Sequence, residues 1–213
     1  MLLPRGLYAV VDDAVRPDLP LPEKARLLAR AGVRVAQVRC KRSHGREAWE
    51  AIRESVQLLQ RAGILALVND RVDWALLSGA DGVHVGDEDL PPAEARQLLG
   101  PRRLVGVTVR GAAGAREAAA AGASYVGLGP VFASRTKEVP APLLGLDRLR
   151  REVAECPLPV VAIGGIGLDT VTDVARTGVH GVAVVSDLWA GETLEARVKA
   201  LQRGFLLGET GPS

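Results

Sequence analysis

The stretch VNDRVDWALLSGADGVHVGDEDL, residues 68–90, decides how this chain folds. It begins at the end of a short apolar run (64–68), continues through a segment at 72–78 long enough for about two helical turns, and enters a second short apolar run at 83–85. The order strand, helix, strand favours parallel pairing, because parallel neighbours need a crossover connection. Each strand ends in carboxylates, the first at Asp70 and the second at Asp87, Glu88 and Asp89.

Neighbouring parallel strands lie about 4.8 Å apart, so Asp70 and Asp89 are expected close together at one edge of the sheet. Carboxylate oxygens are typical ligands of a hard divalent cation such as Mg²⁺, which often bridges to phosphate oxygens. Simpler interpretations stay open, since Asp70 suits a helix cap and residues 87–89 suit an acidic turn. Asp81 precedes its strand and is interpreted as a turn residue.

The same alternation of short β-branched runs and longer helical segments continues through the whole chain. Strands are expected at 7–11, 33–38, 64–68, 83–85, 104–107, 125–128, 160–163 and 182–185. Helices are expected at 23–31, 46–62, 72–78, 93–99, 113–121, 146–155, 168–177 and 193–206. Eight such units favour a single-domain α/β fold, a (β/α)8 TIM barrel over residues 1–207, above an open doubly wound sheet. Residues 208–213 lack apolar side chains and are expected to form a disordered tail.

Composition excludes several classes of partner. The formal net charge is +2 and aromatic residues make up 3% of the chain, so neither nucleic acid nor a membrane is an expected partner. The start is too short for a signal peptide and no apolar run is long enough to span a membrane, which predicts a cytoplasmic protein. Cys40 and Cys156 are expected to be two buried thiols.

In TIM barrels the chemistry lies at the carboxyl ends of the strands. On the second strand Gln37, Arg39 and Lys41 alternate with apolar positions and are therefore expected to face the barrel interior. Burying two cations is costly unless an anion meets them. The sequence therefore predicts an anionic ligand there, or an ion-pair network with the nearby carboxylates.

Three later strand ends add further candidates. Thr108 and Arg110 follow the fifth strand, although a plain strand residue and a rim charge are equally ordinary interpretations. The long loop after the sixth strand is a candidate lid over an anion, or else a solvated surface loop, and it carries Ser134, Thr136 and Lys137. After the seventh and eighth strands, Gly164-Gly165 and Ser186 suit a phosphate, although a double glycine also makes a bare turn. Two anion pockets imply two phosphorylated small-molecule ligands.

Taken in order, these motifs resemble the thiamine phosphate synthase (thiamine-phosphate pyrophosphorylase) family. The resemblance spans nearly the whole chain and rests on YAVVDD (8–13), QVRCK (37–41), VNDR (68–71), GADGVHVGDEDL (79–90), GVTV (106–109), GASYVGLGPVFASRTK (122–137), PVVAIGGI (159–166) and GVAVVS (181–186).

The resemblance implies a TIM-barrel transferase that joins a hydroxymethylpyrimidine diphosphate to thiazole phosphate and releases diphosphate. It implies Mg²⁺ on Asp70 and Asp89, and a diphosphate bound by Arg39, Lys41, Asn69 and Lys137, with Arg39, Lys41 and Lys137 as the catalytic set. The remaining substrate contacts it implies are Gln37, Thr108, Ser134, Thr136, Gly164, Gly165 and Ser186. A homo-oligomer stays open.

Several positions depart from the pattern of the resembling family. Members usually have Gln where this chain has Asp87 and Ser where it has Thr108. They often have His in place of Arg110 and commonly Glu in place of Cys40. Asp87 adds a negative charge beside the expected metal site. Two alternatives therefore stay open: a thiazole tautomerase-like isomerase of the same superfamily, and a catalytically silent barrel that binds thiamine intermediates.

Overall fold

Eight parallel strands close into a barrel in their order along the chain, because β1 pairs with β8 as well as with β2. The structure is a computed structural model and describes residues 1–133, 142–191 and 193–210. The strands are β1 (Gly6–Asp12), β2 (Val35–Arg39), β3 (Leu65–Asn69), β4 (Gly82–Val85), β5 (Leu104–Val109), β6 (Tyr125–Leu128), β7 (Val160–Ala162) and β8 (Gly181–Val184).

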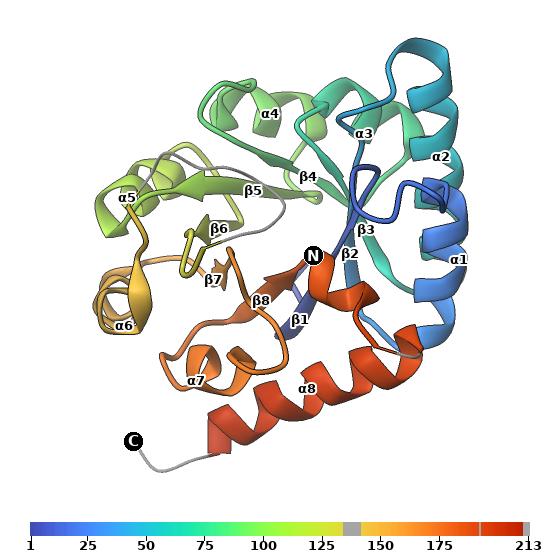
Figure 1. Ribbon diagram of the computed structural model, residues 1–213. Coiled ribbons are helices and arrows are strands. Elements are labelled where there is room, and N and C mark those ends of the chain that lie inside the picture. Colours follow the sequence, from blue (N-terminus) through green and yellow to red (C-terminus); the bar gives the residue numbers. More distant parts are fainter. Residues whose placement is uncertain (134–141, 192, 211–213) are drawn as a thin grey trace.

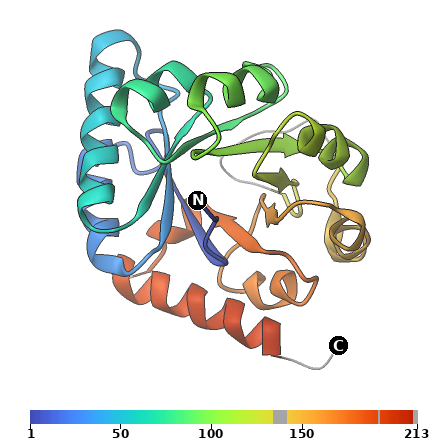
Figure 2. The same ribbon diagram turned by 180° about the vertical axis from the view of Figure 1, so that it is seen from behind.

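Helices surround this barrel, and Figures 1 and 2 show the ring from opposite sides. They are α1 (Leu21–Ala31), α2 (Gly45–Arg61), α3 (Val72–Ser78), α4 (Pro92–Leu99), α5 (Ala112–Ala120), α6 (Gly145–Glu155), α7 (Val171–Ala175), α8 (Leu194–Thr210) and a short 3-10 helix, η1 (Ser186–Trp189). The last helix, red in Figure 1, packs against both α7 and α1 and so completes the ring. The predicted TIM barrel is therefore confirmed, and the open sheet is excluded.

The apolar residues form two cores, one on each face of the curved sheet. The larger core fills the layer between strands and helices, while a smaller one lies inside the barrel and includes Tyr8, Val35, Leu67, Leu104 and Tyr125. Side chains alternate along a strand, so these members identify the inward-facing positions of each strand. By this alternation the inward positions nearest the strand ends carry polar residues: Asp12, Gln37, Arg39, Asn69, His84 and Thr108.

Two predictions about local structure have clear outcomes. Asp81 is a turn residue, as predicted, and its Oδ2 accepts hydrogen bonds from the Ala66 N–H at 2.9 Å and the Gln60 side-chain amide at 3.1 Å. The predicted tail was wrong for residues 208–210, because α8 continues to Thr210. A Cβ at Gly208 would lie 2.4 Å from the Thr172 carbonyl oxygen, so a bare glycine backbone packs on α7 there. Counting apolar side chains misses this kind of contact.

The seventh and eighth units also differ from their expectations. The 3-10 helix η1 was not expected, and α7 is shorter than the predicted helix at 168–177. No helix in the described part of the chain is long and apolar enough to cross a membrane.

Candidate active site

The second strand places its polar residues as the alternation predicts. Gln37 is buried inside the barrel, and its Nε2 donates to the Tyr8 hydroxyl at 2.9 Å. Arg39 forms an ion pair with Asp12, its register partner on β1. Cys40 points to the other side, where its thiol contacts the Asp13 carboxylate. The change at Cys40 therefore lies off the inward face that carries Gln37 and Arg39.

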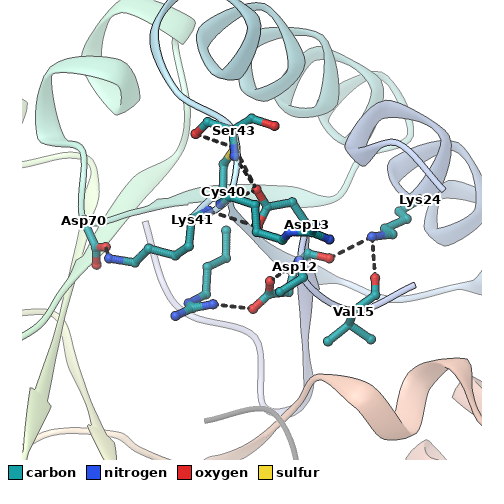
Figure 3. A network of polar contacts seen from close by, with 11 residues as sticks. Asp12, Asp13, Val15, Lys24, Cys40, Lys41, Ser43 and Asp70 are labelled. Carbon is teal, nitrogen blue, oxygen red and sulfur yellow. Dashed lines mark hydrogen bonds and ion pairs between the residues drawn. The ribbon is translucent and has the colours of Figure 1, made fainter. Parts of the chain in front are cut away.

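Asp12 is a site residue that sequence reasoning missed. Its residue exposure is only 3%, and besides Arg39 it accepts a hydrogen bond from the Ala14 N–H at 2.8 Å. Lys24, buried on α1, donates to the Asp12 carbonyl at 2.8 Å and thereby ties the end of β1 to this helix (Figure 3). The available signal was its position two residues after the inward-facing Val10.

Lys41 reaches from the end of β2 to Asp70 at the end of β3, and the two side chains form an ion pair (Figure 3). The predicted ion-pair network is thus present, because both cations of the second strand contact a carboxylate. Their side chains remain partly exposed, at 24% for Arg39 and 48% for Lys41. Both cations therefore stay accessible to an anion at the mouth of the barrel.

Asp13 holds the loop that carries Lys41. Its carboxylate accepts hydrogen bonds from the backbone N–H groups of Lys41 at 2.9 Å and Ser43 at 3.1 Å, near the centre of Figure 3. It also accepts one from the Arg42 N–H at 2.7 Å. Burial by itself raises the pKa of Asp13, but the three backbone donors outweigh it and hold the pKa below its ordinary value. Sequence reasoning missed this residue, since its partners lie on another strand-helix unit.

Asp70 and Asp89 lie together at the ends of the neighbouring strands β3 and β4. Burial raises the pKa of Asp70, and the nearby Asp89 carboxylate raises it further against the opposing effect of Lys41. Two acidic side chains therefore share one partly buried space. Within the described ranges no group of three or more His, Cys, Asp or Glu side chains gathers as a metal cluster.

The backbone shows that Asp70 is not a helix cap. Arg71 occupies the N-cap position of α3, and no side chain there makes a capping hydrogen bond. Asp70 itself has a left-handed φ of 62°, held by its N–H bonding to the His84 carbonyl at 2.8 Å. Few non-glycine residues adopt this conformation outside functional sites and turns. The capping interpretation of Asp70 is therefore wrong.

The acidic turn after β4 is partly as expected. Asp89 Oδ2 accepts the Gly86 N–H at 2.7 Å and closes the turn. Asp87 does not take part in that bond; it forms an exposed ion pair with Arg110, 3.3 Å apart. Arg110 is thus a rim charge with a defined partner.

His84 is the third residue that sequence reasoning missed. Val83 and Val85 face the helices, so His84 between them faces the barrel interior. Its Nε2 lies 3.0 Å from the Thr108 hydroxyl and its Nδ1 lies 3.0 Å from the Tyr125 hydroxyl. Burial lowers the pKa of His84 to about 4, which keeps the imidazole neutral at neutral pH. Thr108 is therefore more than a plain strand residue.

Gly164 and Gly165 follow β7, and Ser186 begins η1 after β8. Both glycines have positive φ, at 103° and 63°. A Cβ at Gly164 would lie 2.6 Å from Pro130 Cα, and one at Gly165 would lie 2.4 Å from the Ala133 carbonyl oxygen. Close packing against the loop after β6 therefore requires both glycines. Their role in binding phosphate stays a prediction.

Three predicted site residues, Ser134, Thr136 and Lys137, lie outside the described residues, as does the lid expected there. The other candidates lie in the carboxyl-terminal halves of the barrel strands or after them: Gln37, Arg39, Lys41, Asn69, Asp70, Asp89, Thr108, Gly164, Gly165 and Ser186.

Comparisons with known proteins agree with this geometry. The family model described as thiamine monophosphate synthase matches residues 7–188. The chain belongs to the thiamine monophosphate synthase family. A thiamine-phosphate synthase of Myxococcus xanthus is 55% identical over 98% of this chain and 96% of its own length. One of Anaeromyxobacter dehalogenans is 47% identical over 95% of this chain and 89% of its own.

A solved structure extends this likeness to three dimensions. Thiamine phosphate pyrophosphorylase from Pyrococcus furiosus superposes with a TM-score of 0.83 at 34% identity, covering 96% of each chain. The predictions of the thiamine monophosphate synthase family, the barrel and a transferase of thiamine biosynthesis are therefore confirmed. The relatives named above are described as thiamine-phosphate synthases or as a thiamine phosphate pyrophosphorylase. None of these three is described as an isomerase or as a barrel without activity, which were the two alternatives.

Proposed function

We propose that the chain condenses 4-amino-5-hydroxymethyl-2-methylpyrimidine diphosphate with thiazole phosphate, giving thiamine phosphate and diphosphate. The observation that carries this proposal is the cluster at the ends of β2, β3 and β4. There, partly exposed Arg39 and Lys41 lie beside Asp12 and Asp70, and Asp70 lies beside Asp89. Cations next to a carboxylate pair suit a diphosphate that is bound together with a divalent metal.

The carboxylate pair fits Mg²⁺. This ion is usually held by one or two carboxylates together with substrate phosphates, rather than by a full protein cage. Burial and Asp89 raise the pKa of Asp70, which means that the doubly charged pair is unfavourable without a counter-charge. Asp70 and Asp89 would hold the metal, which supplies positive charge where the diphosphate leaves.

Arg39 and Lys41 would exchange their carboxylate partners for diphosphate oxygens on binding, with Asn69 and Lys137 as further donors. The C–O bond to diphosphate breaks first and leaves a pyrimidinylmethyl cation. Negative charge grows on the leaving group as this bond breaks, so these cations accelerate the reaction to the extent that they bind the transition state more tightly than the substrate.

The thiazole nitrogen then attacks the exocyclic carbon of the cation, and the new C–N bond gives thiamine phosphate. This step releases no proton, so no general base is needed. Ser134 and Thr136 would contact the thiazole, and Gly164, Gly165 and Ser186 would bind its phosphate. Exclusion of water from the mouth protects the cation from hydrolysis.

An assay of diphosphate release with both substrates and Mg²⁺ tests the proposal. We expect release that depends on both substrates and on the metal, and its loss in Lys41→Ala. The matched control is Lys199→Ala, because Lys199 is exposed on α8, away from the barrel mouth. Tight ligand binding without release would instead indicate a silent barrel. Metal-free conversion between thiazole tautomers would indicate an isomerase.

A further inference from the structure

A chain of hydrogen bonds crosses the barrel interior from β2 to β5. Gln37 Nε2 donates to the Tyr8 hydroxyl at 2.9 Å, and the Tyr8 and Tyr125 hydroxyls are 2.8 Å apart. The Tyr125 hydroxyl lies 3.0 Å from His84 Nδ1, and His84 Nε2 lies 3.0 Å from the Thr108 hydroxyl. The two ends of the chain are thus Gln37 and Thr108, both predicted substrate contacts.

The middle of this chain is sealed from solvent. Tyr8 is 3% exposed and Tyr125 is fully buried. Burial raises the pKa of Tyr8 to about 12 and holds the pKa of Tyr125 well above its ordinary value, so both phenols keep their protons. A neutral phenol has one proton to donate, and a neutral imidazole donates from one nitrogen and accepts at the other.

The surrounding strands leave room for the chain at two mid-strand glycines. A Cβ at Gly106 would lie 2.1 Å from Tyr125 Cζ and 2.5 Å from His84 Nδ1. A Cβ at Gly127 would lie 3.0 Å from His84 Cε1. Glycine inside a strand is unfavourable unless another group approaches closely. These two glycines therefore leave the space in which His84 and Tyr125 contact each other.

If each proton in this buried chain bonds to the next group along the chain, the donation from Gln37 fixes the direction of every other hydrogen bond. Since Gln37 donates to Tyr8, the Tyr8 proton goes to Tyr125, and the Tyr125 proton goes to His84 Nδ1. His84 then carries its proton on Nε2 and donates to the Thr108 oxygen. This leaves the Gln37 carbonyl oxygen as an acceptor and the Thr108 hydroxyl proton as a donor for other partners.

We propose that Tyr8, Tyr125 and His84 are positioning residues that fix the hydrogen-bond directions of Gln37 and Thr108, so that the site selects a pyrimidine with an exocyclic amine. The amine donates to the Gln37 carbonyl oxygen. A 4-oxo analogue would meet that oxygen with a second acceptor and leave a buried polar pair unsatisfied. This inference rests on the proposed function, because it takes the pyrimidine as the ligand of Gln37.

The first test needs no substrate. Nitrogen-15 NMR of the free wild-type protein distinguishes the two neutral tautomers of His84, with His44 and His180 as internal references. We expect the proton on Nε2. A proton on Nδ1 would reverse every bond in the chain, and with it the expected orientation of Gln37, and would overturn the proposal.

The second test measures how well each variant distinguishes the two pyrimidines. The wild type should bind the 4-amino diphosphate on the order of 100-fold more tightly than its 4-oxo analogue. In Tyr8→Phe, Gln37 is free to turn, so this preference should fall by roughly tenfold, about the value of one hydrogen bond. The KM for thiazole phosphate should stay constant.

Ser55→Ala is the matched control, because it removes a buried hydroxyl on α2 that bonds only to the Ala51 carbonyl among the described residues. Its preference for the amine should equal that of the wild type. An unchanged preference in Tyr8→Phe would overturn the inference while leaving the synthase intact. Absence of synthase activity in the wild-type protein would contradict the proposed function. The tautomer of His84 would still show whether the hydrogen bonds from Gln37 to Thr108 run in the expected direction.

Discussion

Arg110 Nη2 lies 3.3 Å from Asp87 Oδ2, so an ion pair joins the loops that follow β5 and β4. Asp87 and Arg110 both differ from the residues that are usual in the family that the sequence resembles, and in the structure these two residues contact each other. The negative charge that Asp87 adds near Asp89 therefore has its own counter-charge. The side chain of Arg110 is 69% exposed and that of Asp87 is 58% exposed, so the ion pair contributes little to the stability of the fold.

The ion pair predicts that Arg110→Ala impairs substrate binding more than folding. Without Arg110, Asp87 adds an unpaired negative charge near the diphosphate site, and the KM for the pyrimidine diphosphate should rise several-fold, most clearly at low salt. The double variant Asp87→Asn with Arg110→Ala should recover the wild-type KM. A double variant as poor as Arg110→Ala alone would show that Asp87 does not act on the substrate.

Asp70→Asn should separate activity from stability. Burial and Asp89 raise the pKa of Asp70, which means that the folded state disfavours the ionised carboxylate at neutral pH. Asparagine removes the charge and also tolerates the left-handed φ of 62°. We therefore expect a higher Tm without metal, together with a loss of turnover on the order of 100-fold. A lower Tm with normal turnover would contradict the assignment of this site.

Asp13 predicts a defined acid sensitivity. Its pKa is lowered below its ordinary value of 3.8, so its contribution to stability is present above that pH and is lost as the pH falls through the lower folded-state value. Asp13→Asn should reduce the free energy of unfolding by about 1–3 kcal/mol at pH 7, since it weakens three backbone contacts. Urea unfolding should show this difference narrowing below pH 3.8.

The matched control for Asp13 is Asp147→Asn on α6, whose carboxylate is 91% exposed. Its unfolding free energy should stay within about 0.5 kcal/mol of wild type. A difference between Asp13→Asn and wild type that is independent of pH would show that the carboxylate charge is not what holds the loop.

Two glycine substitutions should have opposite effects. Gly106→Ala places a Cβ 2.1 Å from Tyr125 Cζ, and overpacking of this kind costs about 1–3 kcal/mol. Gly114→Ala lies inside α5, where the nearest contact of the new Cβ is 3.4 Å, so the higher helix propensity of alanine should stabilise the fold by up to about 1 kcal/mol. Thermal unfolding measures both. Equal effects would argue against a tightly filled barrel interior.

Much of the site was predictable because strand periodicity is local. The alternation along β2 correctly predicted that Gln37 and Arg39 face inward while Cys40 faces outward. The same rule applied to β4 would have found His84 between two outward valines. Alternation also indicates that Asp12 faces inward, but it could not predict the contacts of Asp12, Asp13 and Tyr125, because their partners belong to other units of the chain.

The sequence by itself determined the barrel, the strand ends that bear function and the family, because periodicity, glycine turns and ordered motifs are properties of neighbouring residues. Only the tertiary structure decided which groups meet. Closure of the barrel brings Arg39 to Asp12, Lys41 to Asp70, Arg110 to Asp87, and Tyr8 to Tyr125. These contacts depend on how the units of the barrel are placed relative to one another, and the position of Tyr125 depends also on the space left by Gly106, both of which are set by packing across the whole barrel.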